Sequence, residues 1–248
     1  MIVGMDHDRL LCSLHRDAAA LLEAARAAGP DAPVPACPGW TAGELVWHIG
    51  EVHEFWGTIV ADRLDTPDGY VQSPRPATFD ETVTFAESTA AALLDALEST
   101  DPATPVWTWA SDSTAGFVLR RMAHETAVHR LDAERAAGRD HVIDADLASD
   151  GVDEFLSEFL VWVADGAPPL AGSVHVHCTD VAGEWLVRDD GAGGQVVTRE
   201  HAKGDAAMRG PAADLLLVLW RRLPLDAVEV IGDRATAERL VARTNLSG

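Results

Sequence analysis

The chain has 248 residues, of which 47% are hydrophobic and 24% charged, and a chain of this length can bury the core of one large domain or two small ones without disulfides. Its 19 basic and 40 acidic residues give a net charge of −21, which argues against binding to nucleic acid or to an anionic membrane, because both need a basic surface. The three cysteines include no CxxC pair and the first residues lack the pattern of a signal peptide, so we expect a cytoplasmic protein.

Four stretches within the first 138 residues place apolar residues at helical spacing. Two of these stretches begin with a Thr followed three residues later by a Glu, the spacing of a capping box. We expect helices from about Asp6 to Ala28, from Thr41 to at least Ile59, from Thr78 to Asp101, and from Ser113 or Thr114 to about Gly138. Four long helices with one apolar face each are typical of a four-helix bundle.

The pattern changes near residue 140, where shorter elements and glycine-rich turns replace the long helices. The sequence predicts a helix over Asp146–Val163, strands over Ser173–Thr179, Glu184–Arg188 and Gln195–Arg199, a helix over Ala212–Arg222, a strand over Val228–Ile231 and a final helix over Arg234–Arg243. We therefore expect an α+β protein, with a helical bundle in residues 1–140 and a smaller α+β domain in residues 141–248.

Two of the predicted bundle helices carry ionisable residues on their apolar faces. Glu125 and His129 are four residues apart and lie on one face of the fourth helix, and His48 lies on the apolar stripe of the second helix. A carboxylate in a bundle core is costly unless it is paired or bound to a cation. Two imidazoles and one carboxylate match the three protein ligands of a catalytic zinc site, which leaves a position open, although this set also suits iron, nickel or manganese.

Each of these residues also has an interpretation without a metal. His48 alone fits a hydrogen-bonded core histidine, and Glu125 with His129 fits a core ion pair; only the three together favour a metal. His53 lies about 140° from the stripe of His48, so we expect it to be exposed or peripheral. His124 and His129 are five residues apart and do not share a face, so the metalloprotease motif is absent.

Several segments carry recognisable motifs. They are Pro35-Ala36-Cys37-Pro38-Gly39-Trp40-Thr41 leading to Leu45-Val46-Trp47-His48, then His124-Glu125-Thr126-Ala127-Val128-His129-Arg130-Leu131-Asp132-Ala133-Glu134, then Ala148-Ser149-Asp150-Gly151-Val152-Asp153-Glu154-Phe155, and finally Leu215-Leu216-Leu217-Val218-Leu219-Trp220-Arg221-Arg222 followed by Val228-Glu229-Val230-Ile231-Gly232-Asp233. In this order and over nearly the whole chain, they resemble the mycothiol-dependent maleylpyruvate isomerase family. The first two segments are the most specific.

The resemblance implies a DinB-like N-terminal bundle in which His48, Glu125 and His129 bind zinc, or another divalent metal. It also implies mycothiol as the thiol cosubstrate and an active-site arginine in the C-terminal domain, for which Arg222 fits best. A thiol activated by the metal would add to a small electrophile, which we expect to be a carboxylate. If the thiol later leaves the adduct, the protein is an isomerase. If the thiol stays on the product, the protein is an S-transferase. We expect a monomer or a weak dimer.

Other interpretations stay open at this point. The same ligands suit a hydrolase that uses zinc-bound water, and a bundle that binds a ligand without catalysis is a third hypothesis. Arg222 also fits a surface cation near the C-terminus of a helix. Cys37 fits a loop-packing residue better than a nucleophile, and His175 and His177 fit the solvated face of a strand better than a second metal site.

Overall fold

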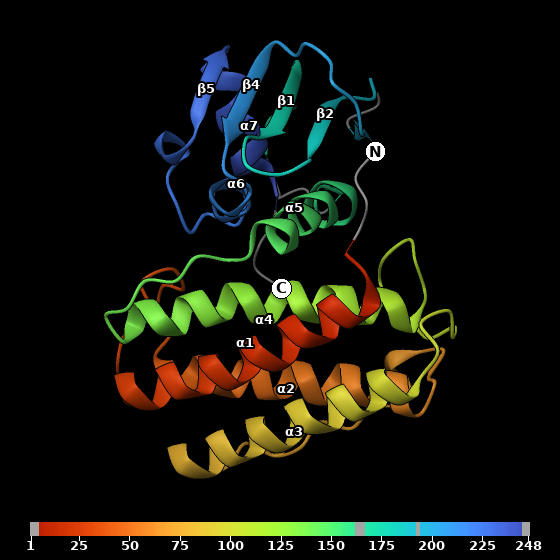
Figure 1. Ribbon diagram of the computed structural model, residues 1–248, viewed down its shortest axis with the longest axis vertical. Helices are drawn as coiled ribbons and strands as arrows, with labels where there is room; N and C mark the ends of the chain where they lie inside the picture. The colour runs from red at the N-terminus through yellow and green to blue at the C-terminus, as the bar shows by residue number, and fades with distance from the viewer. Residues whose placement is uncertain (1–4, 162–166, 192–193, 245–248) are drawn as a thin grey trace. The chain divides into compact units, whose positions relative to one another are not determined.

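The computed structural model describes residues 5–161, 167–191 and 194–244, and Figure 1 shows its helices and strands in chain order. Residue contacts divide the chain into two compact units, one of Asp6–Val142 and one that begins at Ile143. The first unit is built from four long helices and the second from a five-stranded sheet with helices. The predicted α+β class, with an N-terminal four-helix bundle, is confirmed.

The helices of the N-terminal unit begin where the sequence predicts, because each follows a capping side chain. Asp6, Thr41, Thr78 and Thr114 each accept a hydrogen bond from a backbone N–H of the first turn. The helices are α1 (His7–Ala28), α2 (Ala42–Ala61), α3 (Phe79–Ser99) and α4 (Ala115–Ala136), with a short 3-10 helix, η1 (Pro67–Gly69), between α2 and α3.

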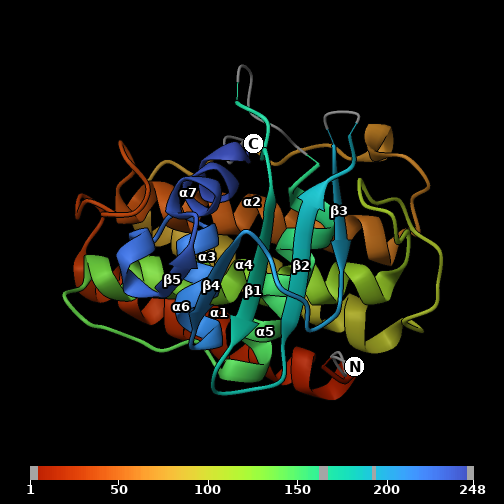
Figure 2. The same ribbon diagram turned by 90° about the horizontal axis from the view of Figure 1, so that it is seen from above.

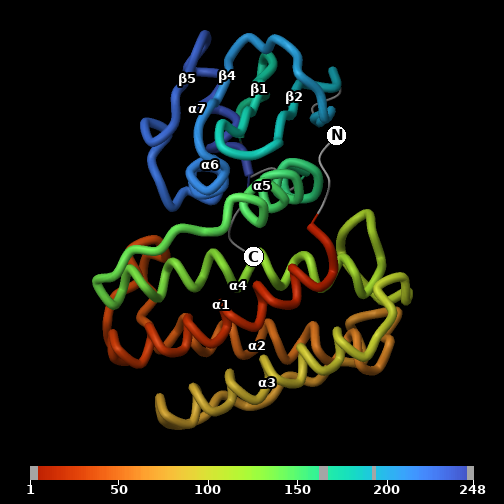
Figure 3. Tube along the Cα trace, viewed as in Figure 1, coloured from red at the N-terminus to blue at the C-terminus, as the bar shows by residue number. Residues whose placement is uncertain are grey.

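The bundle core lies between two pairs of helices. In this unit α1 packs mainly against α4 and α2 mainly against α3 (Figure 3). All four helices contribute fully buried apolar residues, among them Leu21, Leu45, Leu93 and Val118. A Cβ atom at Gly57 would lie 3.3 Å from the Cα atom of Leu93, so the missing side chain lets α2 approach α3 closely.

His53 corrects one of the sequence-based expectations. Its side chain is fully buried rather than exposed or peripheral, and its Nε2 atom lies 2.9 Å from the Oγ1 atom of Thr126 on α4. Burial lowers the pKa of His53 to about 4, so the buried imidazole is neutral. The prediction was wrong because it considered only one buried face of α2, the apolar stripe that contains His48. In the structure α2 packs against more than one neighbouring helix, so a second face of α2 is buried as well.

The C-terminal unit is organised around a mixed sheet with the strand order β3-β2-β1-β4-β5. β1 pairs in parallel with β4, and the other neighbours are antiparallel. The strands are β1 (Ser173–Cys178), β2 (Glu184–Asp189), β3 (Gln195–Thr198), β4 (Ala206–Gly210) and β5 (Glu229–Gly232). The sequence predicts all of them except β4.

Helices cover one face of this sheet, as Figure 2 shows from above. They are α5 (Ala145–Glu154), α6 (Ala212–Leu219) and α7 (Arg234–Arg243), with a short 3-10 helix, η3 (Leu225–Ala227), before β5. The strand residues on the covered face, such as Val174, Val176, Trp185 and Met208, are completely buried. The indole N–H of Trp185 donates a hydrogen bond of 2.8 Å to Asp153 on α5.

Two helices of this unit differ from their predicted ranges. The helix predicted over Asp146–Val163 changes after Glu154 into a π-helix, η2 (Phe155–Phe159), and residues 162–163 lie outside the described part of the chain. The helix predicted to reach Arg222 ends at Leu219, and Arg221 has a left-handed φ of 57°. Within the described residues, no helix combines the length and the apolarity that a membrane span requires.

Candidate metal centre

The three residues singled out from the sequence meet in the bundle. His48 comes from α2, and Glu125 and His129 lie one turn apart on α4. The Oε1 atom of Glu125 lies 3.3 Å from Nε2 of His48 and 3.1 Å from Nε2 of His129. One atom from each side chain therefore faces the same small volume, and the three atoms lie within 4.8 Å of one another.

Glu125 is held in its ionised form by the charges around it. Burial acts to raise its pKa, but the Arg121 guanidinium and the His129 imidazole outweigh burial and hold the pKa of Glu125 well below its ordinary value. Arg121, one turn earlier on α4, forms a salt bridge with the Oε2 atom of Glu125. Because Arg121 occupies Oε2, the other oxygen of the carboxylate is directed at the two histidines.

His129 is oriented by a second carboxylate. Its Nδ1 atom lies 3.0 Å from Oδ2 of Asp132, whose side chain is fully buried. Burial acts to lower the pKa of His129, but Glu125 and Asp132 raise this pKa to about 9, so without a metal His129 carries a proton at neutral pH. A hydrogen bond from Nδ1 to Asp132 fixes the ring so that Nε2 faces Glu125, the arrangement that oriented metal-ligating histidines adopt.

The donor set fits a divalent transition metal. Ligand atoms around a tetrahedral zinc ion, with bonds of about 2.0–2.1 Å, lie about 3.3 Å from one another. The distances of 3.3 and 3.1 Å from Glu125 to the two imidazoles are close to this spacing. A cation bound by two neutral imidazoles and a carboxylate would take the place of the second proton of His129. Three protein ligands leave room for another ligand on the metal.

A second group of candidate ligands shares His129. Cys37, His129 and Asp132 also bring ligand atoms within 4.8 Å of one another, and the thiol of Cys37 lies 3.7 Å from Oδ2 of Asp132. This group uses Nδ1 of His129, the atom directed at Asp132. Because Nε2 of the same ring faces Glu125, we take His48, Glu125 and His129 as the ligand group and Asp132 as the residue that orients it.

An aromatic side chain flanks the candidate ligand group. The ring of Trp40 lies edge-on to His48 at 4.9 Å and is stacked with His129 at 6.3 Å between ring centroids. A separate hollow of about 280 Å³ in this unit includes none of the three candidate ligands in its lining. It is lined by Glu51, Val52, Phe55, Trp56, Tyr70 and Gln72.

Arg222 belongs to the C-terminal unit. Its guanidinium donates a hydrogen bond of 3.0 Å to the carbonyl of Trp220 and lies 5.9 Å from the centre of the Trp220 ring. These contacts place a cation just beyond the C-terminus of α6, where it favours the helix dipole. The role of Arg222 in catalysis stays a prediction.

Sequence reasoning missed the two residues that orient the ligands, Arg121 and Asp132. Both could be found from spacing, since Arg121 precedes Glu125 by four residues and Asp132 follows His129 by three. Side chains at these separations meet on one helix face. His124 is also buried, but it lies outside the three groups of candidate ligands found among the described residues.

Two family models match the chain. The Mycothiol maleylpyruvate isomerase N-terminal domain matches residues 11–134, and the MDMPI C-terminal domain matches residues 146–239. A search of curated proteins found no match.

Two solved structures are also similar. They are a crystal structure of the mycothiol-dependent maleylpyruvate isomerase, with 14% sequence identity, and one of a variant in which a histidine is replaced by alanine, with 13%. In both comparisons the TM-score is 0.60, and the match covers 91% of this chain and 93% of the other. At such low identity the likeness concerns the fold alone.

Proposed function

Because the chain belongs to the mycothiol maleylpyruvate isomerase family, we propose that it is a metal- and mycothiol-dependent isomerase or S-transferase that acts on a small electrophile. The metal is zinc or another divalent transition metal, held by His48, Glu125 and His129. We expect the electrophile to carry a carboxylate. Isomerisation and S-transfer begin with the same activated thiol, so both stay within the proposal.

The observation that carries the proposal is the convergence of three ligand atoms whose neighbours are already engaged. Nε2 of His48, Nε2 of His129 and Oε1 of Glu125 face one another. The remaining donor atoms of the two α4 residues are held by Asp132 and Arg121. A core ion pair needs only Glu125 and one partner, whereas this arrangement directs two imidazole nitrogens at one oxygen.

Each residue has a defined task in the proposed site. A divalent ion bound there would lower the pKa of a thiol ligand, so that thiolate is present at neutral pH. Glu125 offsets one positive charge, and Arg121 keeps its second oxygen away from the ligand group. Asp132 accepts the hydrogen bond of the Nδ1 proton of His129 and so directs Nε2 inward, where the metal would take the place of the second proton. Trp40 shields the two imidazoles from water on one side.

Arg222 is proposed to bind the carboxylate of the substrate. A guanidinium pairs with a carboxylate through two parallel hydrogen bonds, which an ammonium does not reproduce. If Arg222 only stabilises the end of α6, Arg222→Met should lower the melting temperature and leave kcat/KM unchanged. If it binds substrate, the variant should lose activity on a carboxylate electrophile while keeping its activity on an uncharged one.

The proposal is tested by metal content and thiol dependence, measured on the same samples of protein without an affinity tag. Removing both histidines, in His48→Ala/His129→Ala, should abolish one equivalent of bound zinc and all activity on a panel of electrophiles that includes maleylpyruvate. His15→Ala is the matched control, because His15 is exposed and outside the candidate ligand groups. Cys37→Ala should retain the metal.

The outcomes separate the competing functions. Turnover with mycothiol but not without a thiol supports the proposal, and failure with maleylpyruvate alone restricts only the substrate. Equal turnover with and without thiol would favour a hydrolase that uses metal-bound water. Unchanged zinc content and activity in the double variant would exclude His48 and His129 as ligands.

A further inference from the structure

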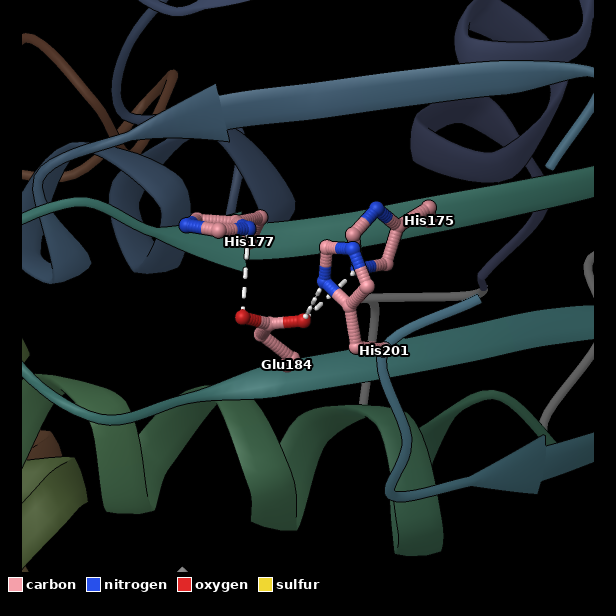
Figure 4. A group of neighbouring side chains, drawn as sticks. All are labelled: His175, His177, Glu184 and His201. Atoms are coloured by element: carbon pink, nitrogen blue, oxygen red, sulfur yellow. Dashed lines mark hydrogen bonds and ion pairs between the residues drawn. The ribbon is translucent and has the colours of Figure 1, made fainter. Parts of the chain in front are cut away.

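A further group of candidate ligands, separate from the bundle, lies on the sheet of the C-terminal unit. It consists of His175 and His177 from β1, Glu184 from β2 and His201 from the connection between β3 and β4. Figure 4 shows the three imidazoles gathered around the carboxylate of Glu184. One ligand atom of each residue lies within 4.8 Å of the ligand atoms of the others.

The register of the sheet explains why the two strands bring these residues together. His177 and Glu184 are directly opposite in the antiparallel β1–β2 pair, so their side chains leave the same face. His175 is two residues earlier on β1 and shares that face. This is the face opposite to the one covered by α5, α6 and α7, since the alternating residues Val174 and Val176 point to the buried side.

The contacts place an imidazole nitrogen near each oxygen of Glu184. Oε2 lies 3.3 Å from Nε2 of His175 and 2.5 Å from Nδ1 of His201, and Oε1 lies 3.4 Å from Nδ1 of His177. The centroids of the three rings are 5.3 to 6.3 Å apart. Imidazole and carboxylate groups at such separations are the ligands that zinc prefers in proteins.

We propose that the C-terminal unit holds a second divalent transition metal, of the zinc type, through His175, His177, Glu184 and His201. Four protein ligands complete a tetrahedral site and leave no open position, so this site is structural rather than catalytic. It would fix the β3–β4 connection to β1 and β2. The proposal is independent of the bundle site, because it shares no residue with it.

The ligands differ in how firmly the fold holds them. The side chain of His175 is 10% exposed and those of His177 and Glu184 are 26% and 30% exposed, whereas that of His201 is 79% exposed. The sheet therefore presets three of the four ligands, and His201 completes the site from the connection. Removal of His201 should weaken metal binding without unfolding the sheet, which makes His201→Ala the most informative single variant.

The cation that the register of the sheet places next to this group is paired with a carboxylate. Arg209 on β4 lies beside His177 in the parallel register, but its guanidinium forms a salt bridge of 3.2 Å with Glu229.

The competing explanation is a polar sheet face in which Glu184 accepts hydrogen bonds from histidine N–H groups. This explanation requires no metal and predicts that Zn²⁺ binding does not depend on the three histidines.

The test counts zinc in the full chain, free of any affinity tag, after dialysis against a zinc buffer. We expect about two equivalents in the unmodified chain and about one in His48→Ala/His129→Ala, which lacks the bundle ligands. His175→Ala/His201→Ala should also retain about one equivalent, and His15→Ala should retain both. When His201→Ala is added to His48→Ala/His129→Ala, the zinc affinity of the C-terminal site should fall at least tenfold, as measured by competition with a chromophoric chelator.

The outcomes distinguish this site from the bundle site. If His48→Ala/His129→Ala binds no zinc, the second site is excluded and the bundle site is supported. If that variant keeps one equivalent, which His175→Ala/His201→Ala added to it then abolishes, the second site is established. Circular dichroism of each variant checks the fold. If His175→Ala/His201→Ala folds poorly, Glu184→Gln, which keeps the size of the side chain, replaces it and should cause the same loss of zinc.

Discussion

At the scale of single residues, the two oxygens of Glu125 have different partners, and this difference defines the candidate site. Oε2 is paired with Arg121, and Oε1 faces two imidazoles. A carboxylate with one oxygen neutralised by a buried cation remains ionised in an apolar bundle. Arg121 therefore keeps Glu125 ionised and leaves Oε1 available as a ligand atom.

Asp132 gives the first prediction at this scale. Asp132→Asn keeps the size of the side chain but removes the charge that orients His129. We expect zinc affinity of the bundle site to fall about 10- to 100-fold, because outer residues that hold a ligating histidine contribute this much to affinity. Competition with a chromophoric chelator measures it, with exposed Asp95→Asn as the matched control. An unchanged affinity would show that Asp132 does not orient the ligand.

His53 gives a prediction about pH. Burial lowers its pKa to about 4 in the folded chain, from an ordinary value of 6.5. Below pH 6.5 the unfolded chain takes up a proton that the folded chain excludes, so the free energy of unfolding falls as the pH drops from 6.5 to about 4. The loss amounts to about 3 kcal/mol, at about 1.4 kcal/mol per pKa unit.

His53→Gln should reduce that loss, measured by urea unfolding of chelator-treated protein at pH 7 and pH 4.5. His129 does not interfere in this window, because its folded pKa of about 9 places its own change in stability between pH 6.5 and 9, where stability falls as the pH rises. His15→Gln is the control and should leave the loss unchanged. The same loss in His53→Gln as in the unmodified chain would contradict the assignment.

The candidate ligands stood out in the sequence because an ionisable side chain on an apolar helix face is costly, which makes Glu125 and His129 conspicuous. The helix pattern also predicts that both share a face. It does not predict which neighbour covers a second face of the same helix, and for this reason the burial of His53 against Thr126 was missed. The sequence also did not predict that His201 lies beside His175 and His177. The position of His201 depends on the path of the connection between β3 and β4, and a connection has no periodic pattern.

At the scale of elements, α3 depends on a cap that the sequence predicts. The side chain of Thr78 accepts a hydrogen bond from the N–H of Glu81, and the Glu81 carboxylate accepts one from the N–H of Thr78. Thr78→Ala should lower the free energy of unfolding by about 1 kcal/mol, measured by urea unfolding followed by circular dichroism. Thr84→Ala is the control: it makes the same change at an exposed position in the middle of α3, and it should not destabilise the helix.

Elements defined by local signals were predictable, and elements defined by their partners were not. The four bundle helices have long apolar periods and capping residues, so their predicted starts agree with the structure. β4 has the sequence Ala-Ala-Met-Arg-Gly, with no β-branched residue, and it becomes a strand because β1 and β5 pair with it on either side. Tertiary pairing therefore outweighs local preference in the middle of this sheet.

At the scale of the whole molecule, the chain is strongly acidic while its candidate substrate is an anion. The net charge is −21, and several arginines are committed to ion pairs, such as Arg130 with Asp17 and Glu134. The field at a distance from the surface is therefore negative. A carboxylate electrophile must approach against this field, and only cations close to the site can offset it.

This balance predicts how activity depends on salt. The Debye length shortens from about 30 Å at 0.01 M salt to about 8 Å at 0.15 M, which screens the net charge more than a cation in contact with the substrate. For a carboxylate electrophile we expect kcat/KM to rise several-fold over this range, and for an uncharged electrophile to change little. Steady-state kinetics in sodium chloride at constant pH and zinc concentration measures both. A fall in kcat/KM with added salt for the carboxylate alone would mean that positive charge near the site, such as that proposed for Arg222, governs the approach of the substrate instead of the net charge of −21.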